Sequence, residues 1–264
     1  MEFWLLYLAT GLFAGFLAGL LGVGGGLVIV PMLAFIFAAE QFPAAHIMHL
    51  ALGTSLASIM FTSISSLRAH HAHGAVNWSV VRGISPGIVF GTLAGSLVAA
   101  QLSTFFLKVF FIVFIYYVAV QMLLNITPKP ARQLPGMVGL FAAGGVIGGV
   151  SSLVGIGGGT LSVPFMTWCN LKMHQAIGTS AAIGFPIAAA GAVGFLFNGL
   201  MAQGLPQYSW GYLYLPALAG LVLASVLTAP FVARLAHRLP VAKLKKIFAA
   251  LLLVLGTRML VSLL

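Results

Sequence analysis

The chain has 264 residues, of which 61% are hydrophobic and only 5% charged, so its polar side chains cannot cover the surface of a soluble domain. The formal net charge of +10 does not indicate a nucleic-acid-binding patch, because the basic residues are scattered between apolar runs. We therefore predict an all-α polytopic membrane protein whose surroundings are the lipid bilayer, with no nucleic-acid partner.

Ten apolar segments follow one another along the chain, and most have the ~20 residues that a membrane-spanning helix needs. In the first half they cover residues 4–21, 27–39, 47–67, 78–100 and 105–124. In the second half they cover residues 137–154, 160–168, 174–197, 212–235 and 244–264. Because segments 27–39 and 160–168 are short, we predict about eight to ten transmembrane segments, with the short helices either broken or re-entrant.

Two glycine-rich stretches precede the short segments. Residues 22–31 read GVGGGLVIVP, and residues 155–164 read GIGGGTLSVP. Irregular backbone at membrane depth is tolerated only where protein buries it or where it lines a wet cavity. A helix that begins there presents free N–H groups and the positive end of its dipole, which suits a small anion. The alternative interpretation is that the glycines only allow close helix packing.

A second pair of matching blocks follows the glycine stretches. Residues 49–55 read HLALGTS, and residues 174–180 read HQAIGTS. Because polar and helix-breaking residues keep one order in both halves, the pattern indicates an internal duplication. We predict a first transmembrane repeat over residues 1–126, a proline-rich linker over 127–135 and a second repeat over 136–264, which together form one membrane domain.

The distribution of Lys and Arg predicts the orientation of the chain. If loop 234–246 is cytoplasmic, alternate crossing places linker 127–135 on the same side, together with ten of the twelve Lys and Arg residues. Both termini are then periplasmic, and the second repeat is inverted relative to the first. The two glycine stretches enter the membrane from opposite faces, so their helix N-termini can face each other near the midplane.

The candidate site combines backbone from the glycine stretches with side chains from the blocks that follow them. The hydroxyls add hydrogen-bond donors, although such groups in membrane helices often bond to their own helix. The histidines can donate to an anion or titrate, or they can simply contact a loop at a helix start. The predicted substrate-binding residues are Gly24, Gly25, Gly26, Gly157, Gly158, Gly159, Thr54, Ser55, Thr179, Ser180, His49 and His174.

Few groups in the chain suit other chemistry. The sequence contains no Asp, and Glu2 and Glu40 lie outside the predicted spans, so a carboxylate proton relay or sodium site is hard to build. We expect no cofactor and no metal ion, because the histidines at positions 70, 71 and 73 have no Cys or carboxylate nearby and fit a solvated loop. An enzyme built on His49 with Ser55, or on the equivalent pair, would lack an orienting acid.

Residues 19–33 (GLLGVGGGLVIVPML) and 153–166 (LVGIGGGTLSVPFM), with the two H-x-A-[LI]-G-T-S blocks, resemble the TauE/SafE sulfite exporter family, also called TSUP. The resemblance covers nearly the whole chain. It implies transport of a sulfur-containing anion such as sulfite, thiosulfate or an organosulfonate like sulfoacetate, usually as export across the bacterial inner membrane. We expect a secondary transporter that works by alternating access. An importer, a channel-like permease for another small anion, an intramembrane enzyme and a homodimer stay open as alternatives.

Overall fold

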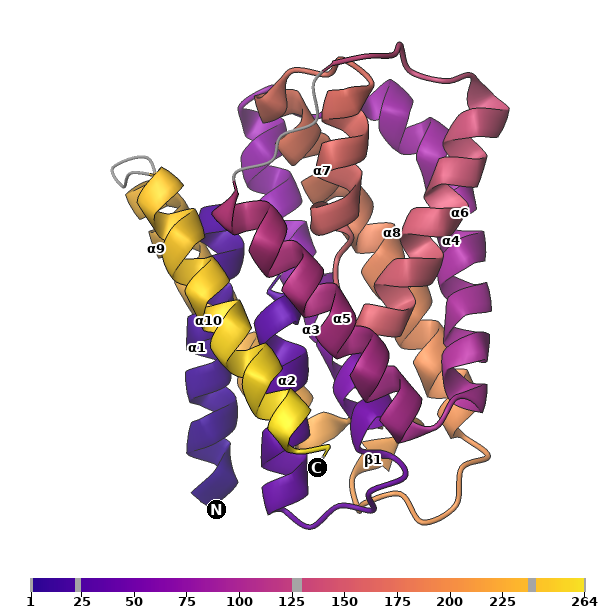
Figure 1. Cartoon of the computed structure of the whole chain (residues 1–264), viewed down its shortest axis with the longest axis vertical. Coiled ribbons are helices and arrows are strands. Elements are labelled where there is room, and N and C mark those ends of the chain that lie inside the picture. The colour runs from indigo at the N-terminus through magenta and orange to yellow at the C-terminus, as the bar shows by residue number, and fades with distance from the viewer. Residues whose placement is uncertain (1, 22–24, 125–129, 237–240, 264) are drawn as a thin grey trace.

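A computed structural model describes the chain except residues 1, 22–24, 125–129, 237–240 and 264 (Figure 1). The described residues form ten helices and one two-stranded hairpin. The first half contains α1 (Glu2–Leu21), α2 (Gly26–Ala39), α3 (Ile47–Ala72), α4 (Trp78–Gln101) and α5 (Thr104–Leu123). The second half contains α6 (Met137–Val154), α7 (Gly159–Trp168), α8 (Met173–Gly199), β1 (Ser209–Trp210), β2 (Leu213–Tyr214), α9 (Leu215–Ala236) and α10 (Val241–Val261).

Each predicted apolar segment contains one helix, so the all-α polytopic membrane fold is confirmed. By length and composition, α3, α4, α5, α6 and α8 are the five described helices that can cross a membrane on their own. Large apolar side chains face outward from them, among them Phe90, Val113 and Phe197, each more than 60% exposed. Such an apolar outer surface is stable in hydrocarbon and would not be stable in water.

Two local predictions were wrong. The sequence predicts a solvated loop at the histidine cluster, but α3 continues to Ala72, so His70 and His71 lie in its last turn. The indole Nε1 of Trp78 donates a hydrogen bond to Nδ1 of His71 over 3.3 Å, which holds this turn against the start of α4. Loop 234–246 is also mostly helical, because α9 ends at Ala236 and α10 begins at Val241.

The two short helices start differently from their neighbours. Asn77 and Ser103 cap α4 and α5 with side-chain oxygens that accept from backbone N–H groups in the first turn. By contrast, α2 and α7 follow Gly25 and Gly158, whose φ angles of 70° and 76° lie in the left-handed region that favours glycine. Neither helix has a side-chain cap. The N–H groups of Val28 and Leu161 donate to the carbonyls of Gly25 and Gly158, which leaves the two preceding N–H groups of each helix uncapped.

Each short helix returns the chain to the end of the bundle from which it came. The hydroxyl of Tyr7 near the start of α1 donates to Glu40 at the end of α2, so these two ends lie together. The backbone N–H of Ala131, just before α6, donates to the carbonyl of Trp168 at the end of α7 over 3.1 Å. With lengths of about 21 and 15 Å, α2 and α7 are therefore arms of re-entrant hairpins and do not cross the bundle.

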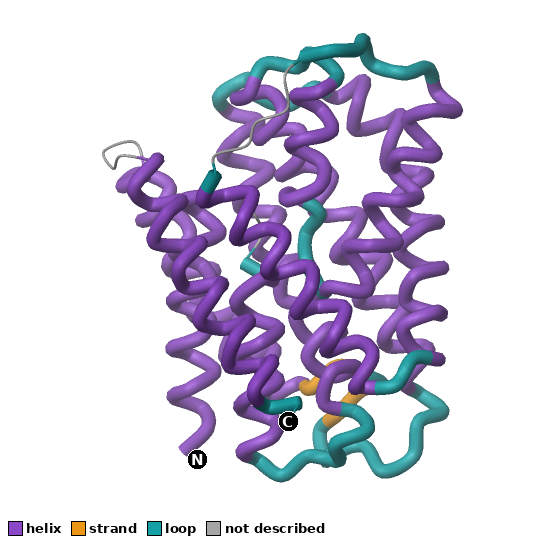
Figure 2. The backbone as a smooth tube through the Cα atoms, in the orientation of Figure 1, coloured by secondary structure: helices purple, strands orange, loops and turns teal. Residues whose placement is uncertain are grey.

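The hairpins lie in opposite halves of the bundle. In Figure 1, α2 occupies the lower half and α7 the upper half, and both termini lie at the lower end. Residues 130–136, which contain neither helix nor strand, lie at the upper end in Figure 2. This arrangement agrees with a linker and termini on opposite membrane faces, while the assignment of one face to the cytoplasm stays a prediction.

Helix packing joins the two halves of the chain. Helix α4 packs along α6, and α1 packs along α9, while α3 pairs with α8 and α5 pairs with α10. If each helix of the first half corresponds to the helix five places later, α4 corresponds to α9 and α1 corresponds to α6. The contact between α4 and α6 is then equivalent to the contact between α9 and α1. The other two pairs join a helix to its own counterpart. A two-fold relation produces this pattern. The inverted repeat itself stays a prediction.

Candidate functional site

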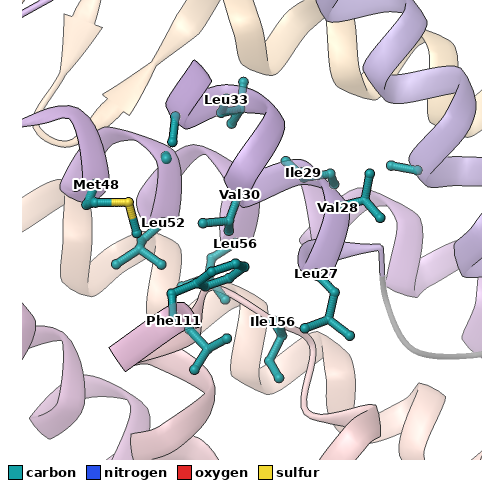
Figure 3. Packing of buried hydrophobic residues seen from close by; sticks show 14 of the residues in the cluster. Leu27, Val28, Ile29, Val30, Leu33, Met48, Leu52, Leu56, Phe111 and Ile156 are labelled. Atoms are coloured by element: carbon teal, nitrogen blue, oxygen red, sulfur yellow. The ribbon is translucent and has the colours of Figure 1, made fainter. Parts of the chain in front are cut away.

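The two glycine segments meet inside the bundle. A Cβ added to Gly26, the first residue of α2, would overlap the carbonyl oxygen of Gly155 and lie 2.9 Å from the Cα of Ile156. Residues 155–160 are all buried, and so are Gly25 and Gly26. Figure 3 shows Leu27 from the first half and Ile156 from the second half in one packed cluster. Predicted residue Gly24 lies outside the described residues.

The N-terminus of α7 has two buried hydroxyls beside it that lack hydrogen-bond partners. A Cβ on Gly158, the N-cap residue, would lie 3.4 Å from Oγ of Ser151, which is fully buried. Thr160, in the first turn, is 7% exposed. Among the described residues, neither hydroxyl has a partner. A buried hydroxyl without a partner costs free energy, so such groups indicate a ligand or another unseen partner. Neither residue stood out from the sequence alone.

Both predicted serines also lie at this break. The hydroxyl of Ser55, on α3, donates to the carbonyl oxygen of Gly155 over 2.8 Å. The hydroxyl of Ser180, on α8, shares a 2.8 Å hydrogen bond with that of Ser162 on α7. All of these groups are buried. Thus α3 from the first half bonds to the backbone of the second glycine segment, and α8 from the second half bonds to α7 just after it.

The two predicted threonines occupy equivalent positions at opposite ends of the bundle. Oγ1 of Thr54 accepts from the backbone N–H of Tyr214 just before α9, and Oγ1 of Thr179 accepts from that of Asn77 just before α4, each over 3.0 Å. The preceding glycines, Gly53 and Gly178, allow the facing loop carbonyls to approach closely. These bonds give both threonines a structural role between the halves, and their part in substrate binding stays a prediction.

Replacing Thr54 or Thr179 with valine is expected to destabilise the protein by about 1–3 kcal/mol, because each change leaves a backbone N–H without its acceptor. The measurement is thermal unfolding of the purified protein in detergent. Thr62→Val is the matched control on α3, because the hydroxyl of Thr62 donates only to the carbonyl of Ile59 in its own helix. Equal melting temperatures for all three variants would contradict the inter-half role.

The two predicted histidines lie in different surroundings. His49 is buried, its Nε2 donates to the carbonyl of Ala99 over 3.0 Å, and its ring stacks on Tyr212 with 4.9 Å between centroids. His174 is exposed near the start of α8. The structure therefore does not bring the histidines together, and their role in binding stays a prediction.

The described residues contain no group of three His, Cys, Asp or Glu side chains placed to hold a metal ion. The hydroxyl of Ser55 bonds to backbone and that of Ser180 bonds to another serine. The one O–H group of Ser55 is therefore committed to Gly155, and the hydroxyls at the break without a partner among the described residues are those of Ser151 and Thr160.

Comparison with known proteins tests the resemblance. The family model described as sulfite exporter TauE/SafE matches residues 7–259. The chain is 39% identical over 262 residues to a probable membrane transporter protein of Haemophilus influenzae, covering 97% of this chain and 98% of that protein. It is 30% identical over 230 residues to the probable membrane transporter protein YunE of Bacillus subtilis, covering 76% of this chain and 82% of that protein. No solved structure matches the chain. The predicted resemblance is confirmed: the chain belongs to the TauE/SafE sulfite exporter family.

Proposed function

We propose that the chain is a secondary transporter of the bacterial inner membrane that exports sulfite or a small organosulfonate, such as sulfoacetate, by alternating access. The observation that carries this proposal is the buried contact between the glycine segments of the two halves, next to the uncapped N-terminus of α7. Free N–H groups, the helix dipole and nearby hydroxyls together suit a small oxyanion. Relatives named as probable membrane transporters support the assignment.

The charge of the site favours an anion over a cation. The stretches 17–30 and 150–163, which include both glycine segments, contain no acidic side chain. A cation held at membrane depth would normally need such a group. Export of an anion needs no coupling carboxylate, because an inside-negative potential favours its exit by ~2.3 kcal/mol per charge per 100 mV.

The placement of the two hairpins supports alternating access. Helix α2 approaches the centre from one end of the bundle and α7 from the other, and the residues between them are buried. In our proposal this is an occluded state of two inverted repeats, residues 1–126 and 136–264, joined by linker 127–135. A movement of one repeat against the other would open the break to one face at a time.

The substrate class is tested by binding to the purified protein. Thermal unfolding is measured with sulfite, thiosulfate, sulfoacetate, sulfate and phosphate at matched ionic strength. A ligand that binds only the folded state raises the melting temperature in a concentration-dependent way. We expect selective stabilisation by sulfite or sulfoacetate. Equal shifts with all five anions would indicate a non-specific salt effect, and no shift with any of them would contradict the assignment.

A further inference from the structure

The two copies of the glycine motif differ in one consistent way. Residues 17–30 read LAGLLGVGGGLVIV and contain no side chain that can form a hydrogen bond. Residues 150–163 read VSSLVGIGGGTLSV and contain four hydroxyls. Aligned on the three glycines, these are Ser151, Ser152, Thr160 and Ser162, and their counterparts are Ala18, Gly19, Leu27 and Ile29. Only the second copy of the motif thus carries polar side chains.

The described structure shows the same asymmetry. Around the start of α2, Leu27, Ile29 and Val30 are buried in the main apolar cluster (Figure 3). A Cβ added to Gly155 would lie 2.8 Å from Cγ2 of Val30, so α2 presents an apolar side chain to the break in the second half. The start of α2 therefore packs apolar side chains and close backbone against Gly155 and Ile156 of the second half.

Two of the four hydroxyls have no partner. The hydroxyl of Ser152 donates to the carbonyl of Gly149 over 2.8 Å, and that of Ser162 bonds to Ser180. Those of Ser151 and Thr160 have none among the described residues, although the two side chains are fully buried and 93% buried respectively. Both lie at the N-terminus of α7, where the first-turn N–H groups also lack a side-chain cap.

We propose that the transported anion binds at one glycine segment only, the N-terminus of α7, with the hydroxyls of Ser151 and Thr160 as donors. The first glycine segment closes the site as an apolar wall and does not bind the anion. This inference rests on the proposed function, since it assigns the substrate of that transporter to one repeat.

A one-sided donor set selects a class of anion. The hydroxyls on the α7 side satisfy oxygens at one end of the ligand, while the side chains of Leu27 and Val30 on α2 offer no donor. An anion whose only oxygens are three at one end, such as sulfite, fits this arrangement, whereas sulfoacetate carries a carboxylate at its other end. Sulfate carries a fourth oxygen, which would lose its water without gaining a hydrogen bond. The wild-type protein is therefore expected to bind sulfite at least about tenfold more tightly than sulfate.

The test uses Ser151→Ala and Thr160→Val, which remove the hydroxyls with little change in shape. Binding of sulfite to each purified variant is measured by titration. Each variant is expected to bind about tenfold or more weakly, because a hydrogen bond to a charged ligand is lost. The melting temperature without ligand should stay unchanged or rise, since a buried hydroxyl without a partner is removed. A purely structural hydroxyl would lower it.

Thr167→Val is the matched control, because Thr167 is on the same helix and is also 7% exposed, but its hydroxyl donates to carbonyls of its own helix. This variant should bind sulfite as the wild type does. If Ser151→Ala and Thr160→Val also bind like the wild type, or if sulfate binds as tightly as sulfite, the one-sided site is wrong while the transporter assignment survives. If the wild type binds none of the five anions, the proposed function fails, and this inference fails with it.

Discussion

Replacing Gly158 with valine is expected to abolish transport while the protein still inserts into the membrane. Gly158 has a φ angle of 76°, where a β-branched residue is strained by about 1–3 kcal/mol. The new Cβ would overlap the side chain of Ile187 and lie 3.4 Å from Oγ of Ser151. The valine therefore distorts the start of α7 and fills the space beside the unpartnered hydroxyl. Transport of labelled sulfite in proteoliposomes measures the loss, and the amount of protein in the membrane fraction measures insertion.

Gly204→Val separates backbone strain from the effect on the site. Gly204 has a φ angle of 75°, but nothing lies within 4 Å of an added Cβ, and the residue is exposed in the connection between α8 and β1. This variant should keep most of its transport activity. Wild-type transport by Gly158→Val would contradict the role of the second glycine segment. Equal loss in both variants would show that strain at a positive φ angle is sufficient to inactivate the protein.

Replacing Gly91 with leucine is expected to have the largest effect on folding. Gly91 lies where α4 crosses α6, and an added Cβ would overlap the carbonyl oxygen of Gly145 and lie 2.7 Å from its Cα. The obstacle is backbone, so the side chain cannot be accommodated by a rotamer change. Without a hydrophobic driving force between helices in lipid, such close contact is the main source of association. We expect a destabilisation of about 3 kcal/mol or more, since overpacking alone costs about 1–3 kcal/mol.

The yield of monodisperse protein and its melting temperature in detergent measure this effect. Val89→Leu is the control on the same helix, because Val89 is exposed on the outer surface and leucine there would contact only lipid or detergent. The control should unfold at the wild-type temperature. A Gly91→Leu protein that is as stable as this control would mean that α4 and α6 do not need their close approach.

Hydropathy predicted most of the fold. A buried or lipid-facing helix is apolar along its whole length, so its bounds follow from where the apolar run stops, and residues 137–154 agree with α6 at both ends. The two short helices were also predicted, because the three consecutive glycines before each of them interrupt the preceding helix. The hairpin at residues 209–214 was not, since its two-residue strands are too short to show alternation. The extension of α3 to Ala72 was missed because polar residues continue that helix beyond its apolar run.

The site was predictable only in outline. The repeated glycines and hydroxyls predicted a site at the two glycine stretches, and the structure brings Ser55 and Ser180 to the second break. The sequence could not show that Thr54 accepts from Tyr214, which is 160 residues away, because such a contact depends on how the two halves pack. It also could not show which buried hydroxyls lack partners. A comparison of the two glycine stretches could have pointed to Thr160, since the equivalent residue in the first stretch is Leu27, which has no hydroxyl.

The central claim is that one anion is carried through the break between the two halves. Counterflow tests it most directly: proteoliposomes containing the purified protein are loaded with unlabelled sulfite, and uptake of labelled sulfite from outside is followed. A carrier that alternates between two faces predicts a transient accumulation of label that is faster with internal sulfite than without it, and Gly158→Val should lack it. Uptake that does not respond to internal sulfite would indicate a channel-like path and would contradict alternating access.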